Sequence, residues 1–160
     1  MASRVATWIL VLSLWAAACF AQQHALRLFE SGSLDDILAQ RAGRAFMLVI
    51  WSLDCPSCIR DLDILAEMRQ QYPQLDMVMI VTDDRQYQQQ VRDLLARHNL
   101  QDVEAWIFAN TPARRLRYEI DSHWYGEVPR TYFYNANHDR IPYSGALEKR
   151  HIENWLAATR

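Results

Sequence analysis

A continuous apolar run, residues 45–51, leads directly into the motif Cys55-Pro56-Ser57-Cys58. A run of strand length without a polar break is typical of a strand that is buried on both faces of a sheet. Beyond the motif, apolar residues recur at helical spacing up to Tyr72, which precedes a proline. The sequence therefore predicts a buried strand that turns into an amphipathic helix, with both cysteines at the junction.

The rest of the chain continues this alternation of strands and helices. Ser33 is the predicted N-cap of the first helix, and residues 137–139 form a predicted hairpin turn. Strand-helix-strand units pair in parallel and a hairpin adds antiparallel strands, so we expect an α/β fold whose central mixed sheet has helices on both faces. The remaining predicted strands are 25–30, 75–82, 105–109, 131–135 and 140–144, and the remaining helices are 33–43, 87–98, 112–120 and 148–158.

Composition narrows the class of protein. Hydrophobic residues make up 51% of the 160 residues, which is enough for one packed core and excludes a disordered chain. The formal net charge is -2, so there is no basic excess of the kind that binds a phosphate backbone, and we expect no nucleic-acid partner. Residues 22–160 are predicted to form a single domain that is soluble by itself.

The first 21 residues read as a secretory signal peptide. Arg4 precedes an apolar run that ends in small residues, and the predicted cut follows Ala21. An uncleaved membrane anchor is an alternative reading of this run, and a lipoprotein acylated at Cys19 is another. The domain is therefore expected to be exported, with the bacterial periplasm as its compartment, either free or tethered to the inner membrane.

Removal of that segment leaves one cysteine pair, Cys55 and Cys58. A disulfide between them closes too small a loop to stabilise the fold much, so redox chemistry explains the pair better. A zinc site would need four ligands, and no second such pair is present in the sequence. We expect neither a metal nor an organic cofactor, because the sulfur pair itself carries the electrons.

The order of the motif gives each cysteine a role. Pro56 suits the first position of a helix, which puts Cys55 at or near the N-cap, where unsatisfied N–H groups and the helix dipole favour a thiolate. Cys55 is therefore predicted to attack a disulfide in a partner, and Cys58, on the same face of the first turn, to resolve the mixed disulfide.

Two segments carry a resemblance to known proteins. Residues 51–58, W-S-L-D-C-P-S-C, resemble the W-x-x-W-C-x-x-C signature, and residues 128–133, V-P-R-T-Y-F, resemble the cis-proline segment of the thioredoxin-like superfamily. A strand-helix insert at about residues 75–98 points to the exported TlpA/ResA-like branch, which includes thioredoxins of cytochrome c maturation. The resemblance covers most of residues 45–158 and implies the thioredoxin fold.

The resemblance also implies site residues. Pro129 would be cis and packed beside the two sulfurs, and Val128 would pair its backbone with the substrate chain. Trp51 joins them as a substrate-binding residue. Asp61, about one helical turn beyond Cys58, is either the group that takes the Cys58 proton or a solvated surface carboxylate, and the sequence leaves both readings open.

The sequence departs from the family pattern at two positions. Asp54 replaces the tryptophan before the first cysteine. Its negative charge raises the expected pKa of the Cys55 thiol whereas the helix terminus lowers it, so the sequence leaves the direction of the net shift open. Arg130 replaces threonine and brings a cation near the docking groove. We interpret the neighbouring Trp124 and Tyr125 as packing residues. A basic cluster is interpreted as a solvated helix face, and it consists of Arg114, Arg115 and Arg117.

Together these features predict an exported thiol-disulfide oxidoreductase that acts mainly as a reductant of protein disulfides. The family implies a membrane electron donor as a partner, with apocytochromes or metal-site proteins as candidate clients. Three alternatives remain: a thiol peroxidase, a copper-binding chaperone that uses both thiolates, and a redox-inert adaptor with the same fold.

Overall fold

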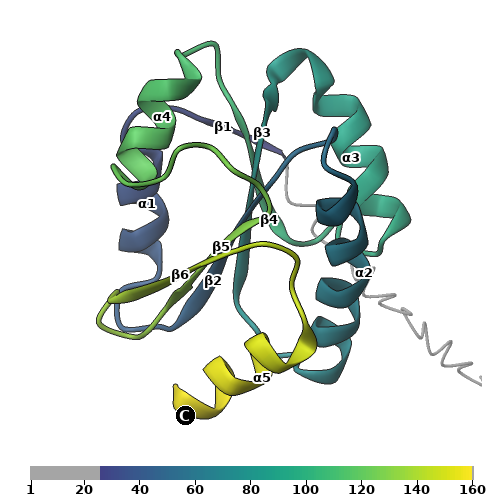
Figure 1. Ribbon diagram of the computed structural model, residues 1–160, viewed down its shortest axis with the longest axis vertical. Coiled ribbons are helices and arrows are strands. Elements are labelled where there is room, and N and C mark those ends of the chain that lie inside the picture. The colour runs from purple at the N-terminus through teal and green to yellow at the C-terminus, as the bar shows by residue number, and fades with distance from the viewer. Residues whose placement is uncertain (1–25, 160) are drawn as a thin grey trace, which may run out of the picture.

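The predicted central strand, β2 (Phe46–Trp51), lies inside a six-stranded sheet of order β1-β4-β3-β2-β5-β6. The structure is a computed structural model that describes residues 26–159 (Figure 1). Strands β1 to β4 are parallel, β5 is antiparallel to β2, and β6 is antiparallel to β5, which confirms a mixed sheet. The other strands are β1 (Arg27–Phe29), β3 (Met77–Asp84), β4 (Glu104–Phe108), β5 (Arg130–Tyr134) and β6 (Arg140–Ser144).

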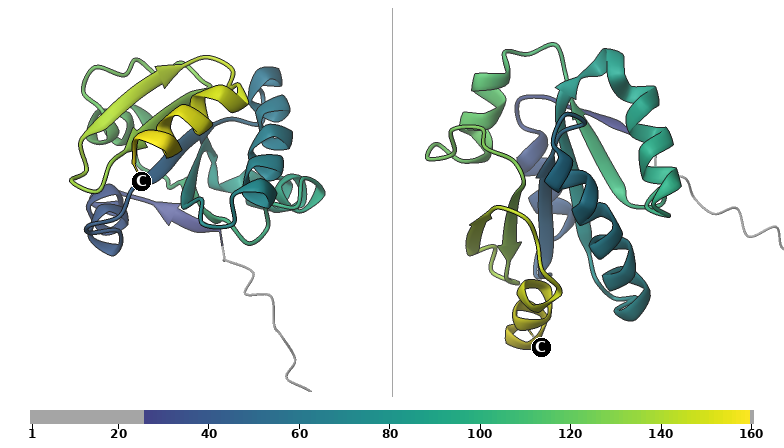
Figure 2. Two further views of the ribbon diagram at one scale, coloured as in Figure 1. Left: turned by 90° about the horizontal axis from the view of Figure 1, so that it is seen from below. Right: turned by 45° about the vertical axis from the view of Figure 1, so that its right-hand side comes forward.

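Helices cover both faces of this sheet, as predicted (Figures 1 and 2). On one face pack α2, α3 and α5, and on the other pack α1 and α4. The strand-helix insert is present as β3 and α3, with a short 3-10 turn, Arg85–Tyr87, between them. The helices are α1 (Ser33–Gln40), α2 (Pro56–Gln71), α3 (Gln88–Arg97), α4 (Ala113–Ile120) and α5 (Lys149–Ala158).

Alternate residues of β2 supply both cores, which explains why its sequence is apolar without interruption. Met47, Val49 and Trp51 belong to the core beneath α2, α3 and α5. Phe46, Leu48 and Ile50 belong to the core beneath α1 and α4. Every residue of the strand is buried, so the prediction of a strand covered on both faces is confirmed.

The start of α1 differs from the prediction. The N-cap is Gly32, with φ +86°, and Ser33 is the first helical residue. The Ser33 hydroxyl oxygen accepts a hydrogen bond from the backbone N–H of Glu30 at 2.9 Å, outside the helix. A left-handed backbone conformation is open to glycine at little cost, so the chain makes its turn one residue earlier than the serine signal suggested.

The predicted signal peptide, residues 1–21, and the lipoprotein cysteine Cys19 lie outside the described residues. Within residues 26–159, no helix combines the length and the apolar character needed to cross a membrane.

The topology brings three chain segments to one edge of the sheet. Parallel strands β2 and β3 both end there, and the antiparallel strand β5 begins there. Ile50 pairs with Arg130, so the residue before β5 enters the sheet level with the end of β2. The C-x-x-C motif and the predicted cis-proline, far apart in sequence, therefore meet at this edge.

Candidate active site

The two cysteines are joined at the N-terminus of α2. Their sulfurs form a disulfide of 2.10 Å, and Cys55 is the N-cap of the helix with Pro56 in its first turn, as predicted. The Sγ atom of Cys55 accepts a hydrogen bond from the backbone N–H of Cys58 at 3.2 Å. This N–H belongs to the first helical turn and has no acceptor within the helix. Its bond to the Cys55 sulfur stabilises negative charge on that atom.

The two cysteines differ in the depth of their burial. Cys55 is 8% exposed, whereas Cys58 is 1% exposed and packs in the core beneath α2. The Ser57 hydroxyl lies 3.4 Å from the Cys55 sulfur. Both residues are buried, and Cys55 is the one nearer the surface; the attacking role of Cys55 and the resolving role of Cys58 stay predictions.

A carboxylate from β3 holds the loop that leads to Cys55. One oxygen of Asp83 accepts the backbone N–H of Leu53 at 2.9 Å, and the other accepts the Ser52 hydroxyl at 3.3 Å. Sequence reasoning missed this residue. Its position just beyond the buried run of β3, beside the end of β2, is the signal that would have found it, because parallel strands end at a common edge.

The peptide bond between Val128 and Pro129 is cis, as predicted from the resemblance. Pro129, the residue before β5, is buried, and Val128 is half-buried against both cores. The pairing of Ile50 with Arg130 places this segment beside the end of β2, from which the chain leads into the cysteine motif. The binding of a substrate chain by Val128 stays a prediction.

Asp61 lies inside the protein, with 3% of its surface exposed, so the reading as a solvated surface carboxylate is wrong. Burial raises its pKa, while a hydrogen bond from the Leu147 N–H and the positive charge of Arg60 act in the opposite direction. Cys58 and Asp61 are three residues apart on α2 and therefore neighbours on one face. A buried carboxyl with a raised pKa is a candidate for proton transfer with the neighbouring thiol, and this role stays a prediction.

Aromatic residues around the site fall into two groups. Trp51 is 1% exposed and Trp124 is buried, with its ring N–H bonded to the Glu127 carbonyl at 2.8 Å. The substrate-binding role of Trp51 therefore stays a prediction, for a ring that the structure places in the core. Tyr125 is 92% exposed, so the prediction that it packs in the interior is wrong, whereas that for Trp124 is confirmed.

Arg130 does not present a free cation to the groove. Its guanidinium bonds to Asp121 at 3.2 Å and to the Ser144 hydroxyl at 2.6 Å. The buried Asp121 also accepts the Tyr132 hydroxyl at 2.9 Å and lies 3.6 Å from Arg140. This network ties the loop before the cis-proline to β5 and β6 and holds the Arg130 guanidinium within the fold, although its Nε has no hydrogen-bond partner among residues 26–159.

Within residues 26–159, no three His, Cys, Asp or Glu residues gather in a way that would hold a metal ion. The groups able to do chemistry at this edge are the cysteine pair, the buried carboxyl of Asp61 and the backbone beside Pro129. Such a set can exchange electrons and protons with a disulfide in another polypeptide.

No protein-family profile matches the sequence, and no curated protein matches it either. Solved structures do resemble it. A secreted disulfide oxidoreductase of Mycobacterium tuberculosis, homologous to E. coli DsbE, superposes with a TM-score of 0.58 at 18% identity, over 75% of this chain and 85% of that one. These values indicate a shared fold between distant sequences.

Two further solved structures resemble the chain. A thiol:disulfide interchange protein of the thioredoxin family from Chlorobium tepidum has a TM-score of 0.62 at 12% identity, covering 76% of this chain and 83% of its own. StoA from Bacillus subtilis has a TM-score of 0.55 at 17% identity, covering 72% and 84%. The chain therefore has the thioredoxin fold, as the resemblance implied.

Proposed function

We propose that this protein is a thiol-disulfide oxidoreductase in which Cys55 and Cys58 are the redox pair. The observation that carries the proposal is the disulfide between Cys55 and Cys58 at the N-terminus of α2, in which a helix N–H donates to the Cys55 sulfur. A disulfide built only for stability has no need of a helix N–H directed at one of its sulfurs. The fold neighbours described as disulfide oxidoreductases and interchange proteins support the same chemistry.

The reaction with a client proceeds in two exchanges. In the reduced protein, the Cys55 thiolate attacks one sulfur of a client disulfide, and the other client sulfur leaves as a thiolate and takes a proton. The Cys58 thiol then loses its proton, which we assign to Asp61, and attacks the Cys55 sulfur. The Cys55–Cys58 disulfide forms and the second client sulfur leaves. Two electrons pass from the pair to the client.

We further propose that the net direction is reduction of protein disulfides in an exported compartment. The re-reduction of the pair then requires an electron donor, for which the proposal names a membrane thiol-disulfide protein. Candidate clients are apocytochromes or metal-site proteins whose cysteines must be free. The sequence pattern of residues 1–21, predicted to be a signal peptide, and a neighbour described as secreted support export.

Insulin reduction tests the chemistry. Residues 22–160 should accelerate the precipitation of insulin chains by dithiothreitol, and Cys55→Ser should abolish the acceleration. Cys58→Ser should retain the first attack and therefore accumulate mixed disulfides with clients, visible as bands on a non-reducing gel that dithiothreitol removes. Activity that survives Cys55→Ser would overturn the proposal.

The reduction potential of the pair tests the direction. Equilibration with glutathione buffers and thiol labelling give this potential. A value near that of thioredoxin, about -270 mV, agrees with a reductant, whereas one near -120 mV is that of an oxidant and would contradict this part of the proposal. Rapid peroxide consumption at Cys55, or tight Cu(I) binding without disulfide exchange, would instead favour the alternative functions.

A further inference from the structure

The side chain of Arg117 lies over the loop that leads to the cis-proline. A Cβ added to Gly126 would be 3.0 Å from Cδ and 3.1 Å from Nε of Arg117. Gly126 precedes Val128 by two residues and has φ +103°. The glycine thus lets a guanidinium from α4 rest on the backbone beside the segment that, in the proposed function, meets the client.

Arg117 shares a face of α4 with Arg114. The two are three residues apart, so their side chains are neighbours on the helix surface. Across residues 26–159, no ion pair or hydrogen bond links the side chain of either one to a carboxylate. Arg115, on the same helix, differs because its guanidinium bonds to Glu119 at 3.1 Å.

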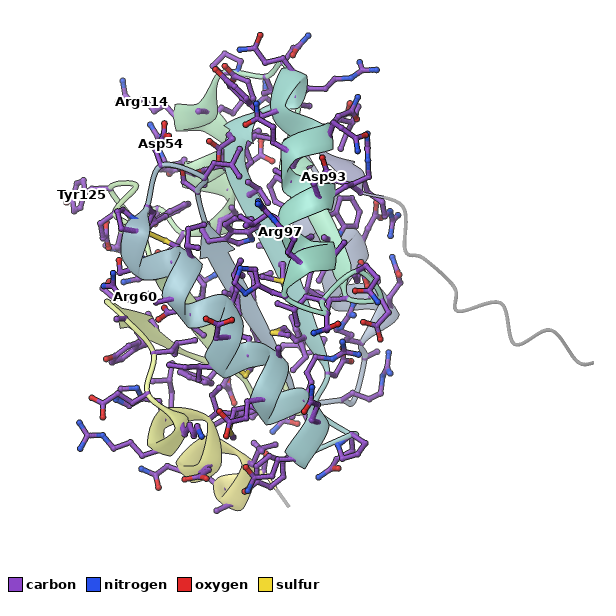
Figure 3. The ribbon with its side chains drawn as sticks, turned by 90° about the vertical axis from the view of Figure 1, so that its right-hand side faces the viewer. Asp54, Arg60, Asp93, Arg97, Arg114 and Tyr125 are labelled. Atoms are coloured by element: carbon purple, nitrogen blue, oxygen red, sulfur yellow. A yellow bond between two sulfur atoms is a disulfide. The ribbon has the colours of Figure 1, made fainter. Side chains whose placement is uncertain are left out.

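Tyr125 extends this surface on the loop itself. Its ring is 92% exposed, by far the largest exposure of a big hydrophobic side chain in the described residues. Figure 3 shows Tyr125, Arg114 and Asp54, the residue before Cys55, all projecting on the same side of the molecule. Exposed tyrosine and arginine are the residue types that protein interfaces favour in their contact regions.

We propose that Arg114, Arg117 and Tyr125, here named the basic-aromatic surface, dock an acidic segment of the client next to its disulfide. This inference rests on the proposed function and adds a preference among its clients. The guanidiniums of Arg114 and Arg117, which form no ion pair with a carboxylate within residues 26–159, carry positive charge beside this loop, and carboxylates complement that charge. The tyrosine ring supplies apolar contact beside them.

Peptide kinetics test the preference. Three peptides contain the same intramolecular disulfide, flanked on both sides by Glu, by Gln or by Lys. The reduced protein should reduce the Glu peptide roughly three- to ten-fold faster than the Gln peptide at low salt, and the Lys peptide more slowly than both. The preference for the Glu peptide should shrink as the salt concentration rises toward 1 M, because the Debye length falls to about 3 Å and charges farther apart than this no longer attract each other strongly.

Variants assign the preference to these residues. The double variant Arg114→Gln/Arg117→Gln should bring the Glu-to-Gln rate ratio close to one, and Tyr125→Ala should slow all three peptides. Arg115→Gln is the matched control, because it removes a paired guanidinium from the same helix, and it should retain the ratio. Equal loss in Arg115→Gln, or a ratio of one in the unmodified protein, would overturn the inference.

The outcomes separate the two proposals. Failure to reduce any peptide would contradict the proposed function, whereas reduction without selectivity would contradict the docking surface alone. Binding to anionic phospholipid vesicles that the double variant abolishes, combined with no peptide selectivity, would assign the arginines to a membrane surface instead and would equally overturn the inference.

Discussion

Asp61 on α2 accepts a hydrogen bond from the backbone N–H of Leu147, 3.1 Å away and 86 residues later in the chain. This contact joins the active-site helix to the segment before α5 and fixes a carboxyl group in the interior. The carboxyl sits one helical turn beyond Cys58, the predicted resolving cysteine. A group that is both held in place and kept from water is suited to receive a proton at a defined position.

Asp61→Asn should slow resolution of the mixed disulfide by about 10²-fold, because the amide accepts the Leu147 N–H but takes no proton from Cys58. Stopped-flow measurement of client release checks this. Asp63→Asn is the control, since the Asp63 side chain is 76% exposed, contacts His98 and lies away from the core. Similar slowing in both variants would contradict a specific role for Asp61.

The raised pKa of Asp61 predicts a pH dependence of stability. The folded state holds the Asp61 proton more tightly than the unfolded state, so the free energy of unfolding should fall as pH rises from the ordinary aspartate value through the folded pKa. Asp61→Asn should lose this decline and be more stable than the unmodified protein at neutral pH. Urea unfolding of the oxidised protein at a series of pH values measures both. A profile that the substitution does not change would contradict the assignment.

Asp83→Ala should destabilise the oxidised protein by about 1–2 kcal/mol, because the Leu53 N–H and the Ser52 hydroxyl lose their acceptor. The loop before Cys55 should also become a better site for limited proteolysis. Asp84→Ala, at the next and exposed position, is the matched control and should change stability by less than about 0.5 kcal/mol. Equal effects would show that the loop does not depend on this carboxylate.

Loss of the Asp121 charge should cost about 3 kcal/mol at neutral pH, because Arg130 and Arg140 would lose a buried partner. Urea unfolding of Asp121→Asn measures this. Tyr132→Phe removes only one donor to the carboxylate and should cost about 1 kcal/mol. Asp93→Asn, on the exposed face of α3, is the control.

Acid should weaken the same network. Burial alone would raise the pKa of Asp121, but the hydrogen bonds from His123 and Tyr132 and the charges of both arginines hold it below its usual range. Stability contributed by this group is present above the unfolded pKa and is lost as pH falls through the folded one. Asp121→Asn should therefore show a smaller loss of stability in acid than the unmodified protein.

Gly126→Ala should be destabilising by more than Gly145→Ala. Both glycines have a positive φ, +103° and +112°, which opposes any side chain by about 1–2 kcal/mol. Only at Gly126 would the new Cβ also meet Arg117, because nothing lies within 4 Å at Gly145. The difference in unfolding free energy between the two variants measures the packing of Arg117 on the loop. Equal losses would show that the contact contributes nothing.

The sequence predicted the elements whose signals are local. The apolar run of β2, the proline after Cys55 and the helical spacing in α2 all act within one segment, and each one formed as expected. The cis-proline needed a second signal, the resemblance of residues 128–133. The strand predicted at residues 131–135 also formed, and its side chains alternate between the two cores, with Tyr132 and Tyr134 in one and Phe133 in the other.

Features that depend on contacts between distant segments were not predictable. The burial of Asp61 results from the approach of residue 147, and the pairing of Arg130 results from Asp121 and Ser144 on other segments. The Asp83 contact with residue 53 arises only when two parallel strands end together. In each case the side chain was visible in the sequence, but its partner was set by the topology of the sheet.

The unequal burial of Cys55 and Cys58 has a consequence for the order in which client and electron donor react. In the proposed cycle, client and electron donor both need the same atom, Cys55 Sγ, because Cys58 has almost no surface. One partner must therefore leave before the other can react, and no complex of all three proteins transfers electrons. In that cycle the domain would react with one partner at a time through Cys55, and an excess of either partner should compete with the other for this residue.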